Sequence, residues 1–155
     1  MMDLSDLVKP QAVLSGVKAG SKKQLLQLLS EKAAELTGLP ERDIFDTVLQ
    51  RERLGSTGTG NGIAIPHGKL KNIKSIMGLF ARLDKPVDFD SFDDEPVDIV
   101  FLLLAPEQAG ADHLKALSRI ARILRDPDMV AKLRGTPDAA ALYSFLTVQP
   151  TSNAA

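Results

Sequence analysis

The residues best suited to do chemistry in this chain are two histidines, His67 and His113. Each comes at a point where a predicted apolar strand or helix meets a loop, not within an apolar stripe. A histidine with an unperturbed pKa of about 6.5 is mostly neutral at pH 7, so it can act as a nucleophile without a partner base. Taken singly, each histidine is equally well explained as a surface residue or a local hydrogen-bond partner.

The segment before His67 makes the nucleophile hypothesis stronger. Three glycines alternate with polar residues and are followed by the apolar residues 63–65 and by Pro66. Glycines tolerate the backbone angles of a nest in which N–H groups bind an anion. This pattern predicts a loop that cradles a phosphoryl group on His67, formed by Thr57, Gly58, Thr59, Gly60, Asn61, Gly62 and Gly68. The alternative is a plain flexible loop.

Other known anion and metal sites fit these residues poorly. A dinucleotide fingerprint needs its third glycine where Ile63 stands and a helix after it, whereas a strand is predicted here. A P-loop needs Ser or Thr after Gly68-Lys69, where the chain has Leu70. His67 and His113 lie 46 positions apart and have no third ligand at metal-binding spacing, so we predict no metal site.

A phosphoryl group on His67 would bring about two negative charges, which need cationic partners. Arg51 is a candidate because it lies near the end of a predicted helix, just before the glycine loop. A donor from His113 would complete the site, since each charge-assisted hydrogen bond offsets only about 1.5–3 kcal/mol of the desolvation cost. For Arg51 the alternative is a solvated charge at a helix C-terminus.

The elements that would position these residues can be predicted from periodicity and capping signals. Ser21 begins a helix that ends at Gly38, and Pro40 begins a second helix that runs toward Gly55. Residues 63–65, 76–83 and 97–104 are predicted strands, and the last, apolar at nearly every position, should be central in the sheet. Asp112 should cap a helix with the apolar stripe Leu114, Leu117, Ile120, Ala121 and Leu124. Helices over 128–134 and 137–145 complete a layered α/β domain.

Length and composition exclude several classes of protein. The 155 residues suit one domain, which we place at residues 1–148, with a disordered tail at 149–155. The absence of cysteine excludes disulfides and thiol chemistry, and the net charge of −1 disfavours nucleic-acid binding. No apolar run approaches the ~20 residues of a membrane helix, and no secretory signal is visible, so we predict a cytoplasmic protein without membrane insertion.

The residues around His67 resemble a known family. The segment GSTGTGNGIAIPHGKL at positions 55–70, with Arg51 before it, is similar to the phosphorylation-site motif of IIA domains of the fructose/mannitol type. These domains belong to the bacterial phosphoenolpyruvate-dependent phosphotransferase system, and the motif is most like that of the nitrogen-regulatory branch. The resemblance extends from about Leu4 to Leu146, and no position in these motifs departs from the family pattern.

This resemblance implies a fold, a reaction and a set of partners. The fold would be a single α/β domain with a mixed sheet flanked by helices. His67 would take a phosphoryl group on Nε2 from an HPr-like carrier, Arg51 would steady it and His113 would orient it by a hydrogen bond, without metal or cofactor. The phosphorylation state would then control binding to targets such as potassium-uptake components or sensor kinases. The alternative is a sugar-specific IIA component that relays the phosphoryl group to a separate IIB protein.

Overall fold

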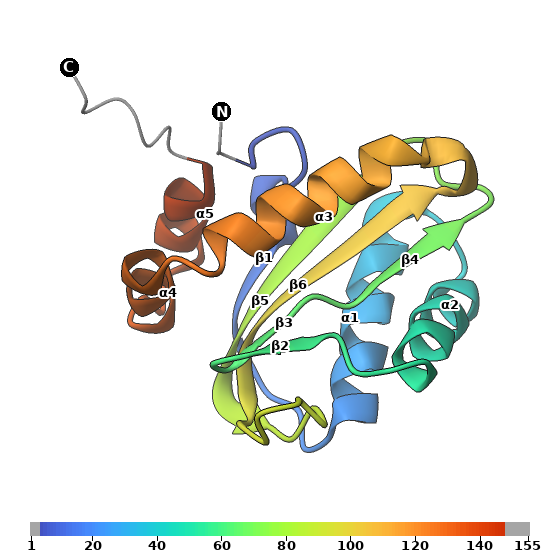
Figure 1. Cartoon of the computed structure of the whole chain (residues 1–155). Coiled ribbons are helices and arrows are strands. Elements are labelled where there is room, and N and C mark those ends of the chain that lie inside the picture. The colour runs from blue at the N-terminus through green and yellow to red at the C-terminus, as the bar shows by residue number, and fades with distance from the viewer. Residues whose placement is uncertain (1–3, 148–155) are drawn as a thin grey trace.

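A mixed six-stranded sheet forms the centre of the molecule (Figure 1). The computed structural model describes residues 4–147. Parallel pairing joins β1 to β5 and joins β6 to both β3 and β4, whereas β5–β6 and β2–β3 are antiparallel. The strand order is β1-β5-β6-β3-β2, with bounds β1 (Val13–Val17), β2 (Gly58–Gly60), β3 (Ile63–Ala64), β4 (His67–Leu70), β5 (Met77–Val87) and β6 (Val97–Pro106).

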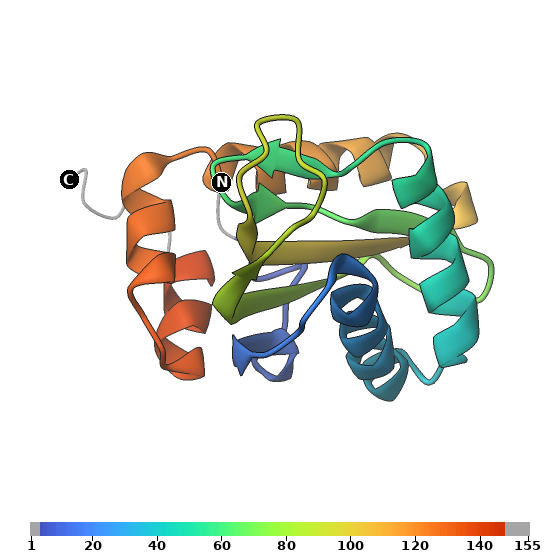
Figure 2. The same ribbon diagram turned by 90° about the horizontal axis from the view of Figure 1, so that it is seen from below.

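Helices flank this sheet, as the sequence predicted. α3 crosses one face and α1 packs on the opposite face, while α2 lies beside β4 and the short α4 and α5 lie at the other end (Figures 1 and 2). Their bounds are α1 (Lys22–Thr37), α2 (Glu41–Arg53), α3 (Ala111–Ile123), α4 (Pro127–Arg134) and α5 (Ala139–Thr147). In the part of the chain that the structure describes, no helix is long and apolar enough to span a membrane.

The signals for the first two helices are confirmed. The Ser21 hydroxyl accepts a hydrogen bond from the Gln24 N–H and caps α1, and Gly38 ends that helix in the left-handed region with φ of 78°. Pro40 stands directly before α2, whose last turn carries Arg51. Arg51 is therefore held on a rigid element, as predicted.

The strand β6 is central, as its apolar sequence predicted. Residues 99–105 are all buried, since β6 is paired on both edges and covered on both faces. Three short strands were not predicted: Ser15 and Gly16 interrupt the apolar residues of β1, β4 has one apolar residue, and β2 is the sequence Gly-Thr-Gly. β3 and β4 lie end to end along β6 with Pro66 between them, which cannot donate a ladder hydrogen bond.

The prediction for α3 is wrong in its cap and at one position of its buried face. Gly110 precedes the helix, and Asp112 lies in the first turn without capping it. Leu114, assigned to the apolar stripe, is 65% exposed, whereas His113 is buried. The observed face is His113, Ala116, Ile120 and Leu124, which also has helical spacing. The other predicted residues, Leu117, Ile120, Ala121 and Leu124, are buried or pack against the core, so the stripe differs from the prediction only at its N-terminal end. The predicted tail at 149–155 lies outside the described residues.

Candidate functional site

The three residues predicted to act together do meet at one place. Arg51 comes from the last turn of α2, His67 is the first residue of β4, and His113 lies in the first turn of α3. Arg51 Nε lies 3.3 Å from His67 Nε2, and the two imidazole ring centroids are 5.6 Å apart. The structure thus brings together an imidazole pair and a guanidinium that are well separated in sequence.

Gly68 allows α2 to approach β4 closely enough for this contact. A β-carbon built on Gly68 would lie 2.7 Å from Cγ2 of Thr47, which lies one turn before Arg51 on α2. Nonbonded carbons normally stay about 3.5–4.0 Å apart, so any larger residue would push the helix from the strand. Gly68 acts as a spacer in the site, and its role is steric.

The hydrogen bonds of His67 define which ring nitrogen is reactive. Its Nδ1 lies 2.9 Å from the carbonyl oxygen of Ile65. Because a carbonyl oxygen only accepts hydrogen bonds, the Nδ1 atom carries the proton and Nε2 has the lone pair. Arg51 Nε donates to that Nε2, while Arg51 Nη1 donates to the Gly55 carbonyl at 2.9 Å and fixes the guanidinium. The neutral ring therefore presents Nε2 as its nucleophilic atom.

His113 is buried beside His67, and its Nε2 has no hydrogen-bond partner among the described residues. Burial lowers the pKa of His113 first of all, and the electrostatic effects of neighbouring His67 and Lys69 lower it further. His113 is therefore neutral near pH 7. A neutral imidazole with an unpaired nitrogen can make a hydrogen bond to a group bound at His67.

An open pocket of about 620 Å³ lies over these side chains. Three of its lining residues, Arg51, Arg53 and Lys69, carry a permanent positive charge, and no carboxylate is among the described residues that line it. Such a surface attracts anions. The lining consists of Thr47, Gln50, Arg51, Arg53, Leu54, His67, Gly68, Lys69 and His113.

The glycine loop is not placed as the sequence predicted. Of the described residues that line the pocket, only Gly68 comes from the predicted cradle, and none comes from 57–62. Gly58–Gly60 forms β2, which pairs with β3, and residues 60–62 make the hairpin turn with positive φ values at Gly60, Asn61 and Gly62. The alternating glycines thus satisfy a tight turn between two strands.

Several polar groups of residues 57–61 are bound within the protein itself. The Asn61 N–H donates to the Asp93 carboxylate, and the Gly58 N–H donates to the Ser56 hydroxyl. Thr57 is buried, with its N–H and hydroxyl bound to Glu52. The Thr59 hydroxyl donates to the Ile63 carbonyl. The predicted cradle is therefore corrected in its placement: of its residues only Gly68 lies at the pocket, whose other lining groups come from α2 and its C-cap, β4 and α3.

Several residues that line the pocket were not predicted, although their spacing from Arg51 and His67 places them on the same side of the helix or strand. Thr47 and Leu54 lie four residues before and three residues after Arg51, so they share its side of α2. Lys69 lies two residues after His67 on β4, and alternate residues of a strand point to the same face. The spacing alone could therefore have predicted that Thr47, Leu54 and Lys69 line the pocket.

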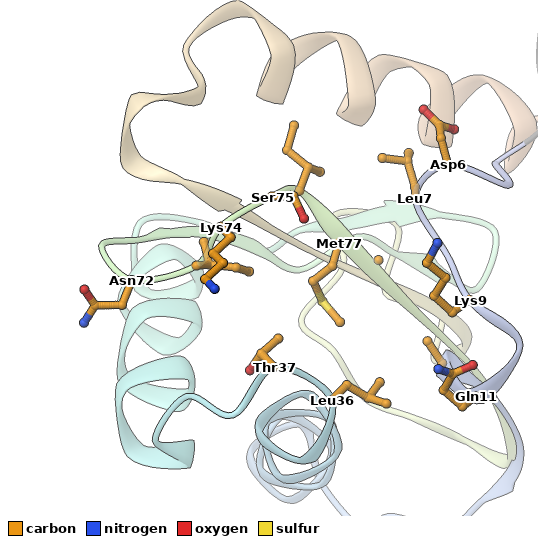
Figure 3. A pocket seen from close by; sticks show the side chains of 14 residues that line it. Asp6, Leu7, Lys9, Gln11, Leu36, Thr37, Asn72, Lys74, Ser75 and Met77 are labelled. Carbon is orange, nitrogen blue, oxygen red and sulfur yellow. The ribbon is translucent and has the colours of Figure 1, made fainter.

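A second hollow, of about 460 Å³, lies away from the histidines (Figure 3). It is bounded by the N-terminal segment, the end of α1 and residues 72–78, with Met77 and Leu36 between Lys9 and Lys74. The apolar residues at the end of β4 and after it lie here or in the core: Ile76 and Met77 line this hollow, while Leu70 and Ile73 are buried. They do not form an apolar rim to the histidine pocket.

Comparisons with known proteins agree with this geometry. Residues 6–148 match the family described as "Phosphoenolpyruvate-dependent sugar phosphotransferase system, EIIA 2". A nitrogen regulatory protein of Bradyrhizobium diazoefficiens is 61% identical over 153 residues, which are 99% of this chain and 100% of that protein.

Solved structures have the same fold. The crystal structure of nitrogen regulatory protein IIA-Ntr from Neisseria meningitidis superposes with a TM-score of 0.87 at 34% identity, covering 92% of this chain and 97% of that one. The crystal structure of IIA mannitol from Escherichia coli gives a TM-score of 0.75 at 21% identity, covering 88% of this chain and 96% of that one.

Proposed function

The chain belongs to the EIIA type 2 family of the phosphoenolpyruvate-dependent sugar phosphotransferase system, and from this premise we propose that it is a phosphohistidine carrier with His67 as its acceptor. The observation that carries the proposal is the orientation of His67. Its Nδ1–H is bound to the Ile65 carbonyl, which leaves the Nε2 lone pair beside Arg51 in a cationic pocket.

The reaction follows from that orientation. The Nε2 lone pair attacks the phosphorus of a phosphohistidine on an HPr-like donor protein, and a new N–P bond forms. The N–P bond of the donor breaks, and its electron pair returns to the donor's ring nitrogen. The proton on Nδ1 stays hydrogen-bonded to Ile65 and stabilises the positive charge that develops on the ring. No metal or cofactor takes part in this transfer.

The surrounding side chains offset the charge of the transferred group. As the N–P bond forms, the Arg51 N–H that now donates to Nε2 is released to donate to a phosphoryl oxygen. Charge-assisted hydrogen bonds of this kind contribute about 1.5–3 kcal/mol each. Lys69 and Arg53 add positive potential, and neutral His113 supplies a hydrogen bond through its unpaired Nε2.

We further propose that the phosphorylation state controls which proteins bind this face. Support comes from the 61% identity to a nitrogen regulatory protein and from two exposed leucines near the site. Leu54 lines the pocket and is 84% exposed, and Leu114 follows His113 and is 65% exposed. A phosphoryl group on His67 adds about two negative charges to this face, which changes the potential that a partner meets. Potassium-uptake components and sensor kinases are the expected targets, and the cytoplasm is the expected location.

The experiment is intact-mass analysis after incubation with phosphoenolpyruvate, the first enzyme of the system and HPr. We expect one acid-labile phosphoryl group on the wild type and none on His67→Ala. No transfer from any HPr-type donor would overturn the carrier function. Target binding is then compared between phosphorylated and unphosphorylated wild type, with His67→Ala as the matched control that cannot be phosphorylated. Equal binding by both wild-type forms would overturn regulation, and transfer onward to a IIB protein would favour the sugar-relay alternative.

A further inference from the structure

A buried carboxylate lies next to Arg51 in sequence and has no part in the transfer itself. The Glu52 side chain is 2% exposed. Its oxygens accept hydrogen bonds from the Thr57 N–H at 3.1 Å and from the Thr57 hydroxyl, and the Lys22 ammonium lies 3.0 Å away. A buried charge is costly unless it is paired and hydrogen-bonded, and these contacts satisfy Glu52. They also hold the start of the glycine segment against the end of α2.

From Thr57 the contacts continue to His67. The Thr57 carbonyl accepts the Ile65 N–H at 3.1 Å, and the Ile65 carbonyl accepts the His67 Nδ1–H at 2.9 Å. Ile65 is therefore held through its N–H while its carbonyl binds the imidazole. The position of the Ile65 carbonyl therefore depends on the position of Thr57, which is fixed by its two hydrogen bonds to Glu52.

The same turn of α2 serves the other side of the imidazole. Arg51 donates to His67 Nε2 and to the Gly55 carbonyl, and the Gly55 N–H donates to the Glu52 carbonyl. Two adjacent residues of one helix thus act on both ring nitrogens of His67: Arg51 directly at Nε2, and Glu52 at Nδ1 through Thr57 and Ile65.

We propose that Glu52 is a positioning residue for phosphoryl transfer, which keeps the proton of His67 on Nδ1 and the lone pair on Nε2. The effect of Glu52 on phosphoryl transfer rests on the proposed function. Its effect on the His67 tautomer does not, because the tautomer can be measured without a donor protein. Lys22, at the start of α1, completes this device by neutralising the Glu52 charge in the protein interior. The hydrogen-bond partners that orient metal-ligating histidines typically change affinity or activity by about 10–100-fold when removed, and we expect an effect of that order for a group that orients His67.

The test is the His67 tautomer, measured from long-range ¹⁵N–¹H correlations of the folded protein at about pH 8. In the wild type the Nδ1–H form should dominate. In Glu52→Ala we expect the ratio of the Nδ1–H to the Nε2–H form to fall at least about threefold, in line with loss of one ordinary hydrogen bond. Glu52→Gln keeps one acceptor for the Thr57 N–H, so it should give an intermediate ratio.

Asp98→Ala is the matched control. Like Glu52, Asp98 is a carboxylate paired with a basic side chain, that of Arg134, so its truncation also breaks an ion pair. It lies on β6 five residues from Leu103, the register partner of His67, which places it about 16 Å along the strand. We expect this variant to leave the His67 tautomer unchanged. A folded Glu52→Ala with the wild-type tautomer ratio, or an equal change in Asp98→Ala, would overturn the proposal.

If Glu52→Ala does not fold, two variants of Thr57 test whether its contact with Glu52 sets the His67 tautomer. Thr57→Val removes the hydroxyl that binds Glu52 and should shift the tautomer in the same direction, whereas Thr57→Ser keeps the hydroxyl and should restore it. An unchanged ratio in Thr57→Val overturns the proposal. Phosphoryl transfer to Glu52→Ala should be about tenfold slower than to the wild type. Failure of the wild type to accept phosphate would refute the carrier function and leave the tautomer result standing.

Discussion

Replacing Gly68 by alanine should damage the site by a steric route that the structure makes quantitative. The added β-carbon would lie 2.7 Å from Thr47 Cγ2, and relief of that overlap requires a displacement of about 1 Å. If α2 moves away from β4 by that amount, the 3.3 Å separation of Arg51 Nε and His67 Nε2 becomes about 4.3 Å, which no longer allows a hydrogen bond. Rotation of the Thr47 side chain relieves little of the overlap. Its β-carbon carries two heavy atoms, so most rotamers bring either the methyl group or the hydroxyl toward the new carbon.

Loss of an orienting contact of about 1.5–3 kcal/mol corresponds to a phosphoryl transfer rate about 10–100-fold below the wild type. Stability should fall as well, by about 1–3 kcal/mol, as is usual for an overpacked site. The rate is measured by intact mass over time with phosphorylated HPr, and stability is measured by urea unfolding. Gly20→Ala serves as the matched control, because the nearest atom to its added carbon is the end of the flexible Gln24 side chain at 3.3 Å.

A compensating substitution tests the steric explanation directly. Thr47→Ala removes the methyl group that the new carbon would meet, so Gly68→Ala/Thr47→Ala should transfer phosphate faster than Gly68→Ala alone. Together with Thr47→Ala by itself, these variants form a double-mutant cycle, for which residues in contact give about 0.5–3 kcal/mol of coupling. Wild-type transfer by folded Gly68→Ala, or a coupling energy near zero, would refute the argument that Gly68 sets the distance between α2 and β4.

Three further predictions concern other parts of the molecule. Arg51→Lys should shorten the lifetime of the phosphohistidine almost as much as Arg51→Ala, because a lysine cannot donate to the Gly55 carbonyl and to the group on Nε2 at once; a wild-type hydrolysis rate in Arg51→Lys would argue against this. His113 has a lowered pKa in the folded state, so the unfolded chain binds the extra proton first as the pH falls. The wild type should therefore lose stability relative to His113→Gln between about pH 7.5 and the lowered pKa, and a pH-independent difference in urea unfolding would contradict the prediction. Gly78→Ala should cost about 1–3 kcal/mol of stability, since its β-carbon would lie 2.4 Å from a ring carbon of buried Phe101; an unchanged urea midpoint would show that the core yields there.

Local physical chemistry was sufficient for much of the fold. Ser21 and Gly38 set the ends of α1 through capping, and the apolar run at 97–104 identified the central strand, because burial on both faces leaves no polar position. The strands β1, β2 and β4 have no such signal of their own. They are strands because β5, β6 and β3 supply partners for their backbone groups, which sequence periodicity does not report.

The same division holds for the site. The sequence by itself determined that His67, Arg51 and His113 were the residues to consider, because a neutral imidazole after a helix and a glycine-rich segment is suited to accept a phosphoryl group, and because the motif resembles a known family. Tertiary structure alone decided that His113 is buried where Leu114 was expected, and that residues 57–62 form a hairpin outside the pocket. It also decided that Glu52 is connected to His67 through Thr57 and Ile65. These outcomes depend on contacts between elements distant along the chain, and such contacts exist only once the sheet has brought α2, β4 and α3 together.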